Sequence, residues 1–440
     1  MVLDTSALEA SAGGFSESIQ KGTHVKIVDW LRKYGIHAYV IMFFFILFFR
    51  YKNIDIVRVP FFLFLGWQWW KKELSLKFFV DPISASILVL VLTALISNII
   101  NGIPLDKIVR LINWFFPYFL GKYLVLKCPE IKFDNLLLYL LFPATLFAMV
   151  GLLGSLFGWE TLFGQELFQG ERYKFTIRKI NWSGFCVGTT LVLSLYFFIR
   201  QKPSWRYGYL FPIVCWIVVF ASLFLIKERK TITMVVAIIM MVLLFYRQYG
   251  VVIVALIAVG IILVSVPIPQ RYQPEQWVYS TSIQIRLNGL ESAIGLFKKK
   301  PLIGHGYPSF RHVHKAYNEE HLDQMRFKKY HFLKFAHNMN LNALVEFGIV
   351  GFFALNFIFF YCWRFYKYRY SGRPLFILGV AVVFFYSTMQ VSGLVHASLR
   401  SDLVFLVFGL YLAMQNRHAS RRSALTAEPQ PKDALKLSGN

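Results

Sequence analysis

One histidine, His337, has the setting in this chain that best suits chemistry. It lies in the run from Phe335 to Asn342, at the end of a polar, basic stretch at 268–340 that interrupts an otherwise apolar sequence. An apolar helix is expected to begin directly after it, so the imidazole should lie at a membrane–water boundary beside a helix N-terminus. A titratable ring next to unpaired backbone N–H groups suits chemistry on a lipid-linked anion.

Three arginines lie near the starts of expected helices. Arg178 and Arg229 are in short cationic segments, each directly before an apolar run, and Arg286 is in the first or second turn of an amphipathic helix expected at 282–297. Guanidinium groups bind phosphate oxygens bidentately, and a helix N-terminus also favours negative charge. Anchoring at lipid headgroups explains any one of these cations, but three segments of the same kind favour an anion-binding site.

A metal site is the alternative for the polar stretch, through His312, His314 and His321. A His-x-His pair is a weak signal, and no carboxylate or cysteine completes a defined zinc pattern. A magnesium–diphosphate site would use clustered carboxylates of the Asp-x-Asp kind, which the outer segments lack. We therefore expect no metal and no other cofactor, and arginines must neutralise any bound anion.

The elements that position these residues are membrane helices. Hydrophobic residues make up 57% of the 440 positions and charged residues 16%, with a mean hydropathy of +0.52. Apolar runs near the length that spans a bilayer recur along the chain, whereas a membrane β-barrel shows short alternating segments. The fold class is therefore all-α and polytopic. The formal charge of +24 comes without a basic soluble domain, so membrane lipids and a phosphate-bearing substrate explain it better than nucleic acid.

We expect about twelve spans. By apolar run length they lie at 36–50, 56–70, 82–101, 106–126, 135–158, 182–200, 207–226, 231–247, 249–267, 341–362, 374–396 and 400–415. The chain is then expected to divide into a cytoplasmic N-terminal segment (1–35), nine spans (36–267), a large and partly helical periplasmic loop (268–340), three spans (341–415) and a disordered cytoplasmic tail (416–440). The distribution of Lys and Arg in the short loops puts both termini in the cytoplasm and the large loop outside.

The order of motifs around His337 resembles a known family. Three motifs in this order look like the O-antigen ligase signature: Arg286 with Leu290, the run Pro301 to Gly306, and the pair His337-Asn338. The pair is followed in the signature by the helix positions Leu341, Leu344, Glu346, Gly348 and Gly351. This family belongs to a superfamily that also includes O-antigen polymerases and bacterial O-oligosaccharyltransferases. The large loop before the last three spans also fits the family's architecture.

The resemblance implies an inverting glycosyltransferase of lipopolysaccharide biosynthesis in the bacterial inner membrane, with its active site on the periplasmic face. The donor would be a glycan on undecaprenyl diphosphate, and the acceptor a sugar hydroxyl of lipid A–core. His337 would act as general base, while Arg286 and Arg229 would hold the diphosphate, with a weaker match at Arg178. Candidate substrate contacts are Asn338, Lys334, His305 and Tyr307.

Several alternatives remain open. O-antigen polymerase and protein O-oligosaccharyltransferase share the same signature, and the sequence does not separate their acceptors. A transporter of lipid-linked sugars would also have a basic cavity, although such proteins place charge near the bilayer midplane and often contain inverted repeats. His337 could be an interfacial histidine that only hydrogen-bonds a neighbouring loop. Glu346 either pairs with an arginine of the site or has a structural role, because a buried carboxylate is costly without a partner.

Overall fold

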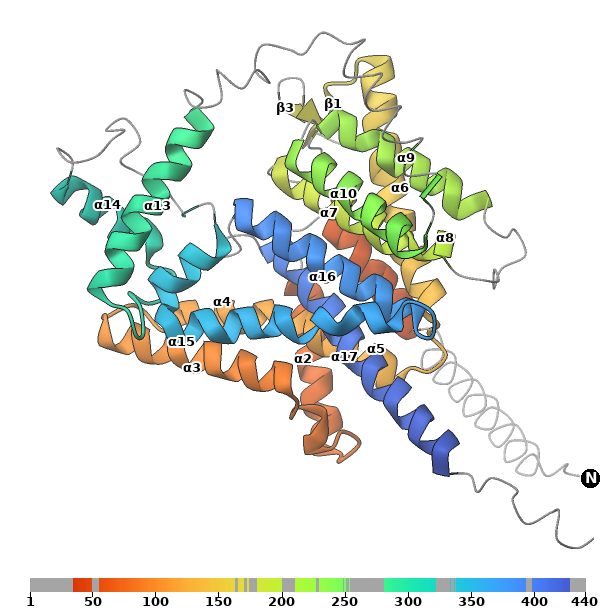
Figure 1. The fold of residues 1–440 in the computed structure, drawn as a ribbon, viewed down its shortest axis with the longest axis horizontal. Helices are drawn as coiled ribbons and strands as arrows, with labels where there is room; N and C mark the ends of the chain where they lie inside the picture. The colour runs from red at the N-terminus through yellow and green to blue at the C-terminus, as the bar shows by residue number, and fades with distance from the viewer. Residues whose placement is uncertain are drawn as a thin grey trace, which may run out of the picture.

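A computed structural model describes the chain at residues 35–49, 55–162, 165–169, 172–173, 180–199, 210–226, 229–247, 249–250, 253, 281–321, 333, 336, 338–392 and 398–427. This part of the chain is mostly helical (Figure 1). A first helix, Gly35–Phe49, is followed by α2 (Asp55–Trp70), α3 (Pro82–Ile100), α4 (Asp106–Trp114), α5 (Phe116–Lys127), α6 (Phe133–Phe157), α7 (Ile180–Ser194), α8 (Tyr196–Ile199), α9 (Leu210–Ile226), α10 (Arg229–Phe245), α13 (Thr281–Lys299), α14 (Phe310–Glu320), α15 (Met339–Tyr361), α16 (Arg373–Ser392) and α17 (Ser398–Ala427).

Short elements complete the described structure. Two antiparallel hairpins follow α6, one pairing β1 (Thr161–Leu162) with β2 (Gln165–Glu166) and the other pairing β3 (Phe168–Gln169) with β4 (Arg172–Tyr173). The 3-10 turns η2 (Leu76–Phe78) and η6 (Trp363–Tyr368) precede α3 and α16.

The helices agree with a membrane protein. Among the described residues, four helical stretches are long and apolar enough to cross a bilayer, namely Pro82–Ile100, Phe133–Phe157, Met339–Tyr368 and Arg373–Gln390. Each expected span coincides with helix except the one at 249–267, almost all of which lies outside the described residues. The expected run at 106–126 is divided between α4 and α5 at Phe115, and the run at 341–362 contains a break at Gly348. The total of about twelve spans and the outer position of the large loop stay predictions.

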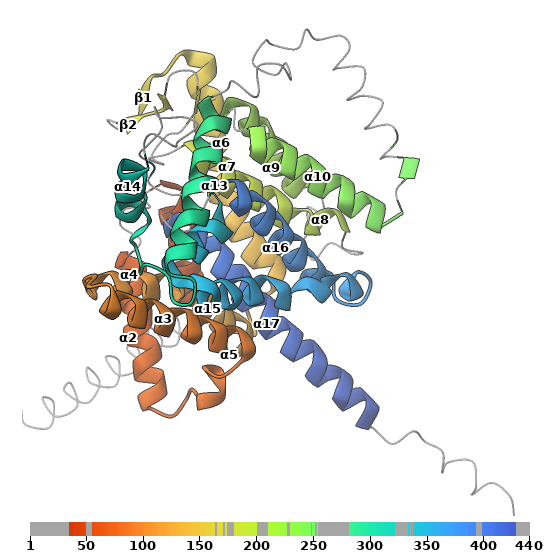
Figure 2. The same cartoon turned by 60° about the vertical axis from the view of Figure 1, so that its left-hand side comes forward.

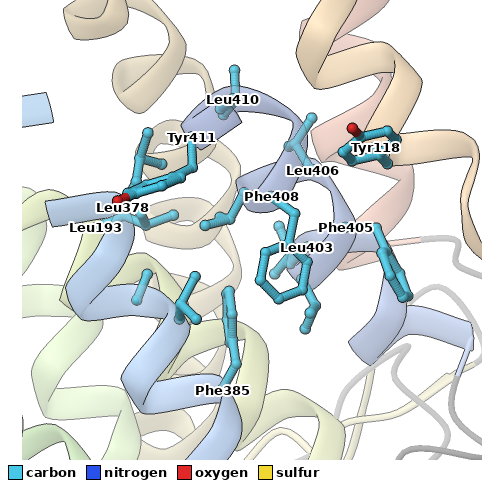
Figure 3. Packing of buried hydrophobic residues seen from close by; sticks show 14 of the residues in the cluster. Tyr118, Leu193, Leu378, Phe385, Leu403, Phe405, Leu406, Phe408, Leu410 and Tyr411 are labelled. Carbon is cyan, nitrogen blue, oxygen red and sulfur yellow. The ribbon is translucent and has the colours of Figure 1, made fainter. Parts of the chain in front are cut away.

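Helices α5 and α17 pack closely in the core. A Cβ at Gly121 would lie 2.5 Å from the Leu406 carbonyl oxygen, and one at Gly409 would lie 2.0 Å from the Tyr118 carbonyl oxygen. These two glycines therefore let the backbones touch, as small residues do in membrane helix pairs. Figure 3 shows the buried side chains of α17 around this contact. The ring of Phe405 meets Phe115 edge-on, with ring centroids 4.8 Å apart.

Buried ion pairs hold distant helices to this core. Arg58 of α2 donates from Nη2 to both carboxylate oxygens of Asp402 in α17, at 2.6 and 2.7 Å. Lys122 of α5 donates to Asp81, the N-cap of α3, at 2.6 Å, and Tyr118 donates to the same carboxylate at 2.6 Å. Both pairs are almost completely removed from solvent. In each pair the carboxylate and the cation compensate each other in a low-dielectric interior.

Helices α13 and α14 form a lobe beside the main group of helices (Figures 1 and 2). A small separate core holds the lobe together, built from Ala293, Leu296, Phe310, Leu333, Ala336 and Val345. Val345 belongs to α15, so the lobe packs directly on the N-terminal part of that helix. Gly295 lies against the Tyr317 ring and Ser292 Oγ donates to Asn318 at 2.6 Å, which joins α13 to α14.

Candidate functional site

Helix α15 is broken at Gly348, and the break sets the geometry of the candidate site. Gly348 has φ 64° and ψ −164°, a conformation available essentially to glycine alone. Asn356 Nδ2 donates to Asn340 Oδ1 at 3.0 Å, although 16 residues of straight helix would separate them by about 24 Å. The two arms of α15, Met339–Phe347 and Ile349–Tyr361, must therefore fold together as a V (Figure 1).

The segment Pro301–Gly306 fills the break. At an interruption in a helix, backbone groups lose their partners four residues away and must find others. Here Ile349 N–H donates to the Pro301 carbonyl at 2.8 Å, and His305 N–H donates to the Val345 carbonyl at 2.7 Å. Gly306 N–H donates to the Glu346 carbonyl at 2.9 Å. The loop thus replaces the helical hydrogen bonds that the break removes.

Glycine is required on both sides of this contact. A Cβ on Gly304 would lie 2.6 Å from the Glu346 carbonyl carbon, and one on Gly348 would lie 2.3 Å from the Leu302 carbonyl oxygen. Gly304 and Gly306 also have positive φ angles of 70° and 90°. The Gly-His-Gly run and the Glu-Phe-Gly run, far apart in sequence, are therefore two halves of one backbone contact.

Asn98, near the end of α3, clamps the same loop. Its Oδ1 accepts from Tyr307 N–H at 2.7 Å and its Nδ2 donates to the Tyr307 carbonyl at 2.8 Å, so one amide satisfies both groups of one residue. The buried Tyr307 ring lies between Trp114, edge-on at 5.3 Å, and Phe347, stacked at 5.7 Å. The expected contact of Tyr307 with the acceptor stays a prediction, and the described structure uses this residue to dock the loop. The sequence signal for Asn98 is a polar amide within an apolar run, which marks a residue with a buried partner but does not indicate which partner.

His305 is likewise buried where the loop meets α13. Its Nε2 hydrogen-bonds to the Leu296 carbonyl at 2.9 Å, and since a carbonyl can only accept, the ring carries its proton on that nitrogen. Burial lowers the pKa of His305 below its usual 6.5, the hydrogen bond to Leu296 opposes this, and the nearby Lys300 and Lys299 lower it further. Burial therefore favours the neutral form of His305, and its expected role with the acceptor stays a prediction.

Glu346 has a structural partner. Its Oε1 accepts from Phe310 N–H at 3.1 Å, so the carboxylate of one helix caps the first turn of another, α14. An acceptor oxygen at a helix N-terminus satisfies one of the backbone N–H groups that have no partner within the helix. The side chain is completely buried. This contact supports the structural alternative for Glu346 over pairing with an arginine of the site.

Asn338 begins the first arm of α15. It has extended backbone angles, and its Oδ1 accepts from Leu341 N–H at 3.1 Å, as an N-cap residue does. One residue before position 337, Ala336 N–H donates to Asn342 Oδ1 at 2.9 Å. The backbone on either side of position 337 is therefore anchored to the first turns of α15. His337, Lys334 and Arg178 lie outside the described residues.

Arg286 lies on the face of α13 that is turned toward this anchored segment. A Cβ on Gly289 would lie 3.4 Å from the Ala336 carbonyl oxygen, and Ala293 shares a core with Ala336. Arg286 precedes Gly289 by three residues, so both lie on one helix face. Its side chain is exposed. Arg229 is the first residue of α10, as expected, although its side chain lies outside the described part.

The three loop histidines do not converge in the described structure. His312 is exposed on α14, whereas His314 is buried against Phe310 with ring centroids 5.2 Å apart. His321 stacks on Tyr317 at 4.3 Å. Within the described ranges, no group of three or more His, Cys, Asp or Glu residues is placed to hold a metal ion. These histidines thus have separate surroundings and do not form a ligand set.

Comparison with known proteins identifies the domain that contains these residues. Residues 217–356 match the family model described as O-antigen ligase. The matched segment includes the start of α10, all of α13 and α14, the Pro301–Gly306 loop and the break in α15. No curated protein matches the chain. The resemblance to the O-antigen ligase superfamily is therefore confirmed, for a protein whose described part is mostly apolar helix.

Proposed function

We propose that this chain, which carries an O-antigen ligase domain at residues 217–356, is itself an O-antigen ligase of the bacterial inner membrane. It moves a glycan from undecaprenyl diphosphate to a sugar hydroxyl of lipid A–core on the periplasmic face, without a metal ion. The family match carries the proposal, because it covers Arg229, Arg286 and the His337-Asn338 pair in one domain.

Arginines hold the donor diphosphate in this proposal. Undecaprenyl diphosphate is a good leaving group once its charge is neutralised, so positioning and electrostatics supply most of the catalysis. Arg286 is exposed on the face of α13 that approaches Ala336, and Arg229 begins α10. Both can bind phosphate oxygens bidentately. Arg178, which precedes α7, is a third candidate from outside the matched segment.

His337 accepts the proton in this proposal. The acceptor hydroxyl oxygen attacks the anomeric carbon, the bond from that carbon to the diphosphate oxygen breaks, and the hydroxyl proton passes to His337. Undecaprenyl diphosphate leaves, and a single displacement inverts the anomeric configuration. The start of the first arm of α15, capped by Asn338, lies one residue after the base. Its positive dipole end disfavours a charged imidazole and so keeps the ring ready to accept.

Two alternatives remain, and one observation bears on each. The family model also fits the reading that the acceptor is a second lipid-linked glycan or a protein, because the superfamily shares this domain. The broken α15 is the observation that fits a transporter of lipid-linked sugars, because helices interrupted in the membrane are common at transporter binding sites. Transfer to lipid A–core separates these alternatives from the proposal.

The test uses purified protein, an undecaprenyl-diphosphate glycan and lipid A–core in the presence of excess EDTA. We expect wild-type transfer to survive EDTA and His337→Gln to lose at least about 100-fold in kcat, the usual contribution of a general base. Arg286→Lys keeps the charge but loses the bidentate geometry, so we expect a clear loss of activity. His312→Gln, an exposed histidine of α14, is the matched control and should transfer at the wild-type rate.

Each contrary result has a separate meaning. Transfer abolished by EDTA would overturn the arginine mechanism, and full activity of folded His337→Gln would remove the base. Product formed on a second lipid-linked glycan and never on lipid A–core would assign the polymerase function. Movement of the donor across a vesicle membrane without transfer would assign the transporter.

A further inference from the structure

Three polar side chains, the buried Asn356 and the partly buried Asn340 and Tyr386, form a closed ring of hydrogen bonds between the arms of α15 and α16. Asn340 Nδ2 donates to the Tyr386 hydroxyl at 3.3 Å, and that hydroxyl donates to Asn356 Oδ1 at 3.2 Å. Asn356 Nδ2 closes the ring by donating to Asn340 Oδ1 at 3.0 Å. The ring therefore joins the first arm of α15, its second arm and α16.

The buried member of the ring, Asn356, has both of its amide groups hydrogen-bonded. Asn356 Nδ2 also donates its second hydrogen to the Phe352 carbonyl at 2.9 Å, one turn earlier in the same helix. The Tyr386 ring is held against Phe359 and Phe360, at 5.4 and 6.0 Å between centroids. Linked hydrogen bonds polarise one another, and a network whose members are satisfied favours one arrangement.

This arrangement fixes where the first arm of α15 begins. The clamp from Pro301–Gly306 holds the hinge at Gly348, but a hinge alone leaves the other end of a helical arm free to swing. Asn340 lies near that far end, two residues after the Asn338 cap. The ring thus ties the far end of the first arm to the second arm and to α16, in addition to the packing of the α13–α14 lobe on the first arm.

We propose that Asn340, Asn356 and Tyr386 are positioning residues, which hold the Asn338-capped start of α15 in the place that the proposed reaction requires. The proposal rests on the proposed function, since it assigns these residues to the same site. They act through the helix arm and touch no substrate. A displacement of about 1 Å at a reacting group can cost about 100-fold in rate, so a ring outside the site can control catalysis.

The first experiment removes one oxygen. Tyr386→Phe deletes the atom that makes two of the three ring hydrogen bonds and keeps the aromatic packing. Tyr411→Phe in α17 is the matched control, because the buried Tyr411 hydroxyl has no hydrogen-bond partner among the described residues. We expect kcat to fall by about 10- to 100-fold in Tyr386→Phe, with KM for both substrates unchanged within about twofold. The pH dependence of kcat should shift as the base loses its setting, and Tyr411→Phe should behave as wild type.

Unchanged kcat in Tyr386→Phe would overturn the proposal. A fall in kcat that follows only a fall in Tm, and disappears when both variants are assayed well below their melting temperatures, would also overturn it by making the ring purely structural. Asn356→Ala gives a second reading, because it removes the member that bonds to both arms. The same pattern of lower kcat with unchanged KM is expected.

A crosslinking measurement separates failure of this proposal from failure of the proposed function. A short bifunctional thiol reagent is applied to Asn340→Cys/Asn356→Cys in membranes, with Asn340→Cys/Gln68→Cys as the control pair. We expect efficient crosslinking in the first pair and none in the second. If wild type transfers no glycan, the proposed function fails, whereas crosslinking still reports the folded arms. Without crosslinking the ring is wrong, whatever the transfer assay gives.

Discussion

At the scale of single residues, the candidate site is built from side chains that replace missing backbone partners. Asn98 pairs with both backbone groups of Tyr307, and Glu346 caps α14. Asn338 caps the arm that begins beside position 337. Without these side chains, the backbone donors and acceptors that they bind would be buried and unpaired, which costs about 1–3 kcal/mol for each group. The polar residues thus stabilise an irregular backbone near the proposed chemistry.

The buried His305 predicts that the stability of the protein depends on pH. Burial, the largest cause, lowers the pKa of the folded ring below the value of 6.5 that it has when exposed. Below about pH 6.5 the unfolded chain therefore binds more protons than the folded one, and stability falls as the pH falls toward the folded pKa. We expect the Tm of wild type to drop between about pH 7.5 and about pH 5.5.

The His305→Gln variant removes this titration and keeps an N–H that can donate to the Leu296 carbonyl. Its Tm should drop less than that of wild type over the same interval, as measured by thermal unfolding in detergent. His312→Gln is the control, since it removes an exposed histidine and should follow wild type. Equal slopes for wild type and His305→Gln would show that the folded ring is not held neutral.

The roles of some of these residues could be predicted from the sequence, and those of others could not. The helix start after His337 could be predicted, because an asparagine before an apolar run is a local signal, and Asn338 is the N-cap. The buried positions of His305 and Tyr307 could not, because their partners are not local in sequence. Tyr307 and Asn98 are 209 positions apart, and no periodicity in either segment indicates the pairing.

At the scale of elements, the important feature is a helix whose break is filled by a loop. An apolar run indicates a span by its length, and residues 341–362 were expected to form one. The apolar run does not reveal that Gly348 has backbone angles that other residues rarely adopt, or that Pro301–Gly306 supplies the missing hydrogen bonds. The same limit applies to 106–126, which the structure divides at Phe115. Composition predicts the helices, and pairing between elements decides where they bend.

Gly348→Ala tests the break. The new Cβ would lie 2.3 Å from the Leu302 carbonyl oxygen, at a φ of 64° that a side chain rarely adopts. We expect a loss of about 3 kcal/mol or more in stability, because strain and a backbone clash act together. The measurements are Tm and the fraction of monodisperse protein after extraction in detergent.

Gly66→Ala is the matched control for this substitution. Gly66 lies within α2 with nothing within 4 Å of its Cβ position, so alanine should be neutral or slightly stabilising there. If Gly348→Ala is as stable as Gly66→Ala and equally active, α15 is not broken in the way described, and the proposed ring of Asn340, Asn356 and Tyr386 loses its basis.

At the scale of the whole molecule, the site depends on a scaffold joined by contacts between distant parts of the chain. The last helix, α17, packs closely on α5 through Gly121 and Gly409 and binds α2 through the Arg58–Asp402 pair. Arg58 and Asp402 are 344 positions apart in the sequence. The scaffold that holds α3, α15 and α16 therefore joins segments from the early and the late parts of the described chain.

A double-mutant cycle on the Arg58–Asp402 pair measures how much the interaction between the two side chains contributes to stability. Arg58→Met alone leaves a buried carboxylate without its bidentate cation, and Asp402→Leu alone leaves a buried guanidinium, so each should lower stability by about 3–5 kcal/mol. Arg58→Met/Asp402→Leu buries two apolar side chains of similar volume instead. Because neither desolvated charge then remains, we expect the double variant to recover most of the loss, as measured by thermal unfolding in detergent.

The cycle also separates stability from catalysis. Both ion-pair residues lie outside the residues proposed to hold substrate, so the double variant should transfer glycan at close to the wild-type rate once folded. Losses in the single variants that simply add in the double variant would show that the two side chains do not interact, contrary to the distances of 2.6 and 2.7 Å. A stable double variant without activity would instead place Arg58 or Asp402 in the reaction, because closure of the scaffold would then be insufficient for transfer.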